Sequence, residues 1–187
     1  MSVNKFGFGD LSFKLLSGAK FAGNQVKHWG TRKIGAGYFE QGLDYTYGFG
    51  EIVEIAGDNE KNYVVKPISS ATADTATLAV IMNEITGATT IHQGTINAGD
   101  KHVPLNLWLL VRENMGTVSV PVVESDTVKV EIGGKVYIGT GADGTIAGSA
   151  YAENVTGTIA REGLVFTSKA GKPTAANGLT AAIGFGL

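Results

Sequence analysis

The stretch Ser125–Thr140, SDTVKVEIGGKVYIGT, has the pattern of a β-hairpin and indicates the fold class of the whole chain. Apolar and charged residues alternate over VKVEI at 128–132, as in a strand with one buried and one wet face. Gly133 and Gly134 follow, and a glycine pair accepts the positive φ angles that a two-residue turn requires. The segment KVYI at 135–138 alternates again and is the expected return strand.

The chain beyond residue 48 repeats this pattern of short apolar runs punctuated by turn residues. The expected strands are 49–55, 63–65, 78–82, 103–111, 117–123, 155–160, 164–167 and 179–187, and the longest expected loops are 87–101, 139–148 and 168–178. Strands spaced about ten residues apart, with turn signals between them, are typical of an all-β domain. We therefore predict a jelly-roll-like sandwich or barrel of short antiparallel strands.

Residues 1–47 have a different composition, in which aromatic side chains are separated by single glycines. This spacing disfavours a helix and favours an extended segment, although 10–18 also fits a short helix capped by Asp10. We divide the chain into an extended N-terminal arm at 1–47 and a β-domain at 48–187. Five rings with few local partners are the predicted anchors for a partner protein: Phe6, Phe8, Phe13, Phe21 and Trp29.

Composition narrows the class of protein further. The 187 residues are 43% hydrophobic and 17% charged, with 27 glycines and no cysteine. The apolar content suffices for a core, and the missing cysteines exclude disulfides, thiolate metal sites and cysteine nucleophiles. No apolar run is long enough to span a membrane, and the N-terminus lacks a signal-peptide pattern, so synthesis in a cytosol is expected.

The net charge of −2 hides an asymmetry between the two ends of the chain. Residues 1–35 carry six lysines and arginines against Asp10, about +5, so residues 36–187 carry about −7. A basic segment could bind nucleic acid, but six charges spread over 35 residues are not a dense cluster. We favour an arm that lies on an acidic protein surface, its own or a neighbour's, and expect no direct contact with nucleic acid.

Tests for catalytic or metal-binding motifs give no convincing site. Gly139–Gly144 matches G-x-G-x-x-G, but no amphipathic helix pattern follows to bind a pyrophosphate. Ser17–Lys20 fits S-x-x-K without its partner motifs, and the three histidines have no ligand spacing. The carboxylates Glu51 and Glu54 lie beside a polar turn and are expected to be solvated. We expect no enzymatic activity, no cofactor and no metal.

Several segments of the β-domain resemble the capsid cement (decoration) proteins of tailed bacteriophages. The glycine turn and G-x-x-V-Y-[IV] strand, the glycine-rich loop, the F-x-[ST]-[AS] element and the last strand correspond to Gly133–Ile138, Gly139–Gly148, Phe166–Ser168 and Gly178–Ile183. Earlier segments are also similar: Phe49–Val53, Ala98–Asp100 and Gly116–Val120. The resemblance spans about residues 48–187.

The resemblance implies a non-enzymatic β-domain that binds and stabilises the lattice of the major capsid protein. It implies the major capsid protein and other copies of this chain as partners, with no membrane partner. The expected location is the outer surface of the virion, after synthesis in the host bacterial cytoplasm. Two alternatives remain: an enzyme on a β scaffold, and a carbohydrate- or ligand-binding β-sandwich using Trp108, Tyr137 and Tyr151.

Overall fold

The computed structural model describes residues 23, 25–28, 34–58, 62–69, 75–82, 93–100, 103–173 and 178–186. Every regular element in these ranges is a β-strand, which confirms the predicted all-β class. The strands are β1 (Gln25–His28), β2 (Ile34–Phe39), β3 (Tyr45–Gly48), β4 (Ile52–Asp58), β5 (Tyr63–Pro67), β6 (Leu78–Ile81), β7 (Gln93–Ile96), β8 (Pro104–Leu109), β9 (Gly116–Val123), β10 (Lys135–Gly139), β11 (Ala150–Tyr151), β12 (Thr158–Phe166) and β13 (Thr180–Phe185).

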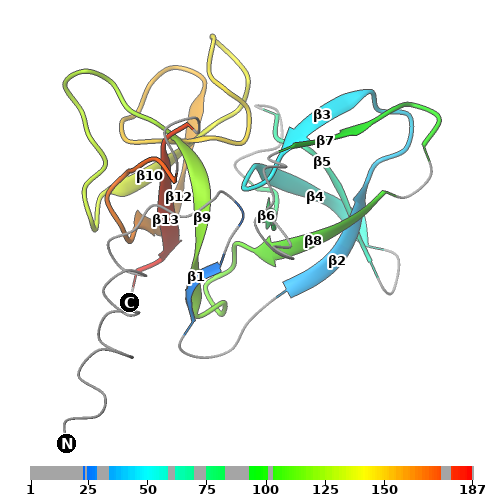
Figure 1. Ribbon diagram of the computed structural model, residues 1–187, viewed down its shortest axis with the longest axis horizontal. Helices are drawn as coiled ribbons and strands as arrows, with labels where there is room; N and C mark the ends of the chain where they lie inside the picture. Colours follow the sequence, from blue (N-terminus) through cyan, green and yellow to red (C-terminus); the bar gives the residue numbers. More distant parts are fainter. Residues whose placement is uncertain are drawn as a thin grey trace, which may run out of the picture.

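Two rings of strands lie side by side (Figure 1). The first barrel closes in the order β2-β5-β4-β6-β8, with β2 and β5 parallel and the other pairs antiparallel. The strands β3 and β7 form a separate antiparallel pair, called here the ribbon. Tyr47 and Ile96 of the ribbon belong to the same buried cluster as Val53, Val65 and Leu107 of the barrel, so the ribbon caps its core.

The second barrel follows from the pairings of the C-terminal half. The strands run in the order β9-β11-β10-β12-β13, and β13 pairs back with β9 to close the ring. The short β11 pairs with β9 only at Val122 and Val123. β1 occupies the same edge of β9 further along, at Gly116–Val118. The N-terminal segment therefore completes an edge that the C-terminal strands leave open.

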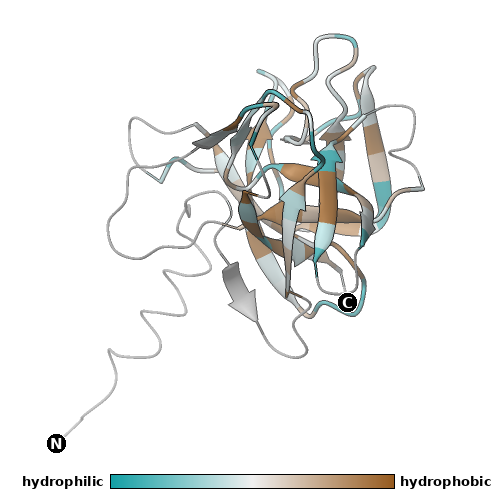
Figure 2. Ribbon diagram, turned by 90° about the vertical axis from the view of Figure 1, so that its right-hand side faces the viewer, coloured by the Kyte–Doolittle hydropathy of each residue, from teal (hydrophilic) through white to brown (hydrophobic). Residues whose placement is uncertain are grey.

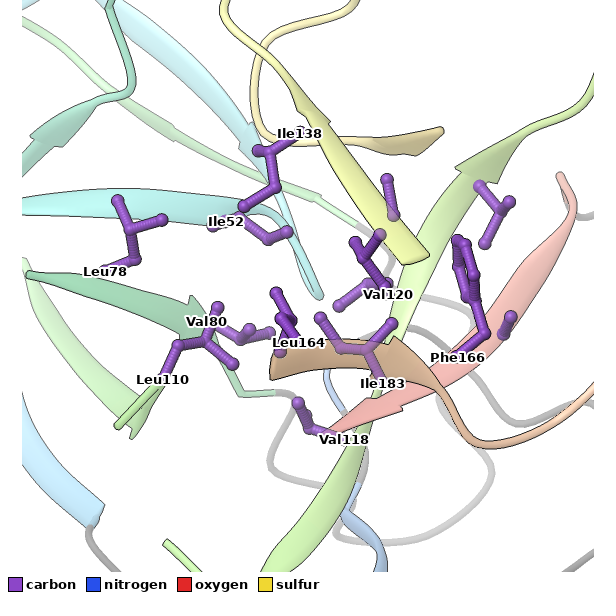
Figure 3. Packing of buried hydrophobic residues seen from close by; sticks show 14 of the residues in the cluster. Ile52, Leu78, Val80, Leu110, Val118, Val120, Ile138, Leu164, Phe166 and Ile183 are labelled. Carbon is purple, nitrogen blue, oxygen red and sulfur yellow. The ribbon is translucent and has the colours of Figure 1, made fainter. Parts of the chain in front are cut away.

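A single apolar cluster joins the two barrels. Ile52, Leu78 and Val80 from the first barrel pack with residues of the second, including Leu164 and Ile183 (Figure 3). Along β4 the side chains alternate, so Ile52 faces this shared core while Val53 faces the interior of the first barrel. Apolar residues are concentrated on the strands, and many connecting loops are polar (Figure 2). The two barrels are consequently joined by one shared core, in addition to the separate core inside the first barrel.

The segment expected as arm contains β1, β2 and most of β3. β2 lies in the first barrel and β3 in the ribbon, so the described barrel begins at Ile34 rather than at residue 48. The glycines of β2 are sites of close packing: a Cβ at Gly37 would lie 2.6 Å from Leu107 Cδ1 and 2.8 Å from the Tyr63 carbonyl oxygen. The glycine–aromatic spacing is here a packed strand, not a free segment.

The predicted hairpin at 125–140 is wrong in its first half. The segment 128–132 is irregular, because Val128 N–H donates to Ser125 Oγ (3.0 Å) and Val130 N–H donates to Glu124 Oε1 (2.8 Å). These side chains satisfy donors that a strand ladder would use. β10 forms as expected but pairs with β11 and β12.

The glycine turn exists in a different form from the one expected. Gly134 N–H donates to the Glu131 carbonyl (2.9 Å), so Ile132 and Gly133 are the central residues, and Gly133 alone has a positive φ, +83°. This is the geometry of a type II turn. Gly133 N–H also donates to the Phe166 carbonyl (2.8 Å), which fixes the turn to the end of β12.

Two further expectations differ from the structure. The expected loop at 87–101 contains β7, which is polar and only four residues long. The expected strands 155–160 and 164–167 are one continuous strand, β12, in which Gly163 has a φ of +79° and permits a bend. The remaining predicted strands correspond to β4, β5, β6, β8, β9 and β13.

Candidate interaction surfaces

The five predicted anchors lie outside the described residues: Phe6, Phe8, Phe13, Phe21 and Trp29. The described body begins next to them. Gly23 N–H donates to the Ser119 carbonyl (2.7 Å), and β1 then pairs with β9. The segment that carries the first four anchors is therefore attached to the second barrel at Gly23.

The ribbon brings together four aromatic rings at one end of the first barrel. The ring centroid of Phe39 lies 5.5 Å from that of Tyr45 and 5.2 Å from that of Tyr47, and the centroids of Tyr47 and Phe49 are 6.1 Å apart in an edge-to-face arrangement. These separations are within the range at which aromatic pairs attract. Burial raises the pKa of Tyr47 above its usual value, which keeps its hydroxyl neutral.

Glu51 lies behind this aromatic group and is not solvated as the sequence predicted. Only 7% of the residue is exposed, and its carboxylate accepts hydrogen bonds from the Tyr45 hydroxyl and from Gly48 N–H (3.0 Å). Burial raises the pKa of Glu51, and the two hydrogen bonds partly offset the rise. The pKa of Tyr45 is raised as well, by burial first and by the charge of Glu51 second.

Both barrels meet at Glu51. Ile52 N–H donates to the Gly148 carbonyl (2.9 Å), and a Cβ at Gly148 would lie 2.4 Å from Glu51 Cγ. Glu54, also expected to be solvated, is buried and pairs with Lys66 at 3.2 Å. Both carboxylates are buried because β4 is covered on one side by its own barrel and on the other by the second barrel.

A pocket of about 170 Å³ opens beside the ribbon. Its wall consists of five mostly apolar side chains and one amide: Tyr47, Phe49, Met82, Pro104, Leu105 and Asn106. Tyr47 and Leu105 are buried, whereas Pro104 is exposed and stands at the rim. A site of this volume suits one ring-sized group.

The loop from Gly139 to Gly148 presents an exposed isoleucine on a firmly held backbone. Gly148 N–H donates to the Gly139 carbonyl (2.9 Å), and the Thr140 hydroxyl donates to the Gly157 carbonyl (2.8 Å). Ile146 N–H donates to the Tyr151 hydroxyl (2.7 Å), yet 58% of Ile146 is exposed. The G-x-G-x-x-G motif thus forms a chain of turns, as its sequence predicted, and no helix follows it in the described residues.

Three other apolar side chains are exposed at the surface of the described body: Ile34, Met115 and Ile132. Ile132 is the most exposed, at 64%, and projects from the Glu131–Gly134 turn. Ile34 pairs with Trp108, and Met115 directly precedes Gly116, which pairs with His28. Ile34 and Met115 therefore flank the connection between β1 and β2.

The alternative sugar-binding surface does not form. Trp108 is 1% exposed within the shared core, and Tyr151 is buried below the Ile146 loop. Tyr137 is half-buried, with the Lys135 ammonium 5.6 Å from its ring centroid. These three side chains do not create one exposed aromatic platform.

The described residues contain no group of three or more histidines and carboxylates that could hold a metal ion. No helix among them is long and apolar enough to cross a membrane.

Comparison with known proteins identifies a shared fold. No protein-family model matches the chain, and no curated protein matches it either. Among solved structures, the chain is similar to one from "The capsid of Myoviridae Phage XM1", with a TM-score of 0.54 and 20% sequence identity. The similarity covers 98% of this chain and 96% of that chain, so it includes both barrels.

Proposed function

We propose that this protein is a structural component of a tailed-phage head and acts as a cement protein on the major capsid lattice. The observation that carries the proposal is the end-to-end likeness to a chain from a phage capsid structure. The resemblance of Phe49–Val53 and Gly133–Ile138 to cement proteins supports the same class from sequence. The role is structural and requires neither a catalytic group nor a cofactor.

The surfaces of the molecule suit such a role. A lattice-binding protein needs apolar groups to bury and a rigid body to present them. Ile132 and Ile146 project from turns that hydrogen bonds fix to the second barrel. The phenylalanines of residues 1–22 add rings next to the attachment at Gly23, and each buried ring contributes about 2 kcal/mol.

The partners that fit this role are the major capsid protein and further copies of this chain around it. Binding at many equivalent positions turns a modest affinity per copy into a large effect on the shell. The proposed location is the outer surface of the virion, reached after synthesis in the host bacterial cytoplasm. The acidic surplus of residues 36–187 disfavours contact with the packaged nucleic acid.

The test is co-sedimentation of the protein with phage capsids assembled without it. Deleting residues 2–22 removes Phe6, Phe8, Phe13 and Phe21 but keeps β1, whose pairing with β9 a longer deletion would destroy. We expect the full chain to co-sediment and the deletion variant to lose most of its binding. Losing several rings costs more than the few kcal/mol that separate occupancy from dissociation.

Two controls separate anchoring from folding. Circular dichroism should show an unchanged β spectrum for the deletion variant, and a variant with all four phenylalanines replaced by alanine should bind as weakly as the deletion. Replacing Trp29 by alanine tests the fifth anchor separately. Failure of the full-length protein to bind capsids would refute the cement role, and normal binding by the folded deletion variant would refute the anchoring role.

A further inference from the structure

The pocket beside the ribbon has the volume of an aromatic ring and nothing in the described residues fills it. Its 170 Å³ compares with the cavity of about 150 Å³ that binds benzene in an engineered protein core. Tyr47 and Phe49 stand edge to face in its wall, so a third ring can join them with favourable geometry. The second pocket at this end, lined in part by Phe39 and Leu43, has a volume of only about 10 Å³ and is too small for a ring.

The end of the first barrel that carries the ribbon has exposed acidic residues beside the smaller pocket. Glu40 and Asp100 line that pocket, and Asp44 accepts a hydrogen bond from Ala98 N–H (2.7 Å). Lys101 follows Asp100 in the sequence, so an acidic surplus remains. Residues 1–22 carry Lys5, Lys14 and Lys20 against Asp10, and they also carry four phenylalanines. The same chain thus supplies both a ring for the pocket and positive charges for the acidic residues at this end of the barrel.

We propose that the pocket formed by Tyr47, Phe49, Met82, Pro104, Leu105 and Asn106 binds a phenylalanine of the same chain's N-terminal segment, Phe6 or Phe8. The inference concerns the free protein and goes beyond the proposed capsid-binding role. In the free protein the pocket covers a ring that would otherwise be exposed. On attachment to a lattice, the other rings of the segment would remain available for binding while this ring occupies the pocket.

Chain length excludes Phe21 from the pocket. Gly23 is fixed at Ser119 in the second barrel, whereas the pocket lies at Pro104, the β8 end that points away from β9 (Figure 1). The six residues of β8 alone span about 17 to 20 Å. At about 3.5 Å per residue, Phe21 reaches only about 7 Å from Gly23, whereas Phe13 reaches about 35 Å and Phe8 about 50 Å. Phe21 cannot reach the pocket, so positions next to it serve as the control for binding.

The absence of cysteine from the chain makes disulfide trapping a clean test. In the full-length protein, Gly7→Cys places a thiol between Phe6 and Phe8, and Pro104→Cys places one on the pocket rim. We expect a crosslinked monomer of changed electrophoretic mobility, formed at least tenfold faster than in the pair Ala22→Cys with Pro104→Cys. Replacing both Phe6 and Phe8 by alanine in the first pair should remove most of this advantage.

A second rim position guards against local damage to the barrel. If Pro104→Cys lowers the thermal midpoint, Asn106→Cys replaces it with the same expected ratio. Equal crosslinking rates for the Gly7 and Ala22 pairs would overturn the proposal, and so would a rate that does not depend on Phe6 and Phe8. Crosslinked dimers in place of the monomer would overturn it as well, because they would show that a second copy fills the pocket. Because no capsid is present, these outcomes are independent of the cement role.

Discussion

The two barrels use similar short strands but close their ends by different means. The first barrel is capped by the aromatic ribbon, which leaves a ring-sized pocket and encloses the carboxylate of Glu51. The second barrel has an aliphatic core around Leu164 and Ile183, and backbone and threonine hydrogen bonds fix its Gly139–Gly148 loop. The second barrel is thus suited to hold groups rigidly for a partner, and the first to admit an apolar group.

Matched phenylalanine truncations give the largest expected contrast between the barrels. Phe166→Ala empties a site 1% exposed in the shared core and should reduce the free energy of unfolding by about 3–5 kcal/mol. Phe39→Ala, beside the ribbon, should reduce the free energy of unfolding by less, because Tyr45 and Tyr47 can move into the space. Chemical denaturation of both variants measures the difference. A larger loss in Phe39→Ala would contradict the idea of an adaptable cap.

The junction between the barrels is tested by two glycines of one loop. Gly148 (φ +71°) and Gly144 (φ +79°) share the cost of a left-handed backbone, but only Gly148 is crowded. A Cβ at Gly148 would meet the Ile52 carbonyl oxygen at 2.6 Å, whereas nothing lies within 4 Å at Gly144. Gly148→Ala should therefore cost about 1–3 kcal/mol more than Gly144→Ala in thermal or urea unfolding. Equal losses would mean that the barrels can separate locally to accept the methyl group.

A third comparison uses glycine turns of equal geometry, one in each barrel. Gly133 (φ +83°) and Gly42 (φ +85°) both have open space where a Cβ would lie, so only backbone strain of about 1–2 kcal/mol opposes a larger residue. Gly133→Val should reduce the stability by the full amount of this strain, because hydrogen bonds to Phe166 hold its turn. Gly42→Val should lose less stability if the connection from β2 to β3 relaxes. Thermal midpoints of the two variants decide, and an unaffected Gly133→Val would show that its turn also relaxes.

The neighbouring Gly134 extends this test to packing. Its φ is not positive, but a Cβ there would lie 2.9 Å from the Glu131 carbonyl oxygen that accepts the turn's hydrogen bond. Gly134→Val should therefore destabilise the protein by opening the turn, even though its backbone is not left-handed.

The parts of the fold that could be predicted from sequence are the strands with enough apolar residues to give a clear signal. β8, β9 and β13 are buried over most of their length, and their apolar sequences predicted them. β3 and β7 are short and partly polar, and β2 contains two glycines, so each lacked the apolar signal. The partner of β10 could not be predicted, because backbone hydrogen bonds to the side chains of Ser125 and Glu124 replace the expected first strand.

The surfaces were harder to predict than the strands. Glu51 is adjacent to a polar turn in sequence, and only the packing of two barrels around β4 explains its burial. The pocket combines residues from β3, the β3–β4 turn, the position after β6, and β8, which no local pattern connects. Ile132 and Ile146 each follow a charged or polar neighbour in an alternating or glycine-rich stretch, so their exposure depends on which face the fold buries.

The smallest expected effect is a pH dependence that arises at the junction through Glu51. Its carboxyl group has a raised pKa in the folded protein, because burial outweighs the hydrogen bonds from Tyr45 and Gly48. Between the ordinary value of 4.5 and this raised value, the folded protein binds more protons at Glu51 than the unfolded chain does. Lowering the pH through that window should stabilise the wild-type protein relative to Glu51→Gln, in which the group cannot ionise. Urea unfolding of both proteins at intervals from pH 8 to pH 5 measures this, since the other titrating groups are common to both and cancel in the difference. A difference that stays constant, or that favours the glutamine variant as pH falls, would mean that Glu51 is hydrated in solution and that the two barrels do not seal around it.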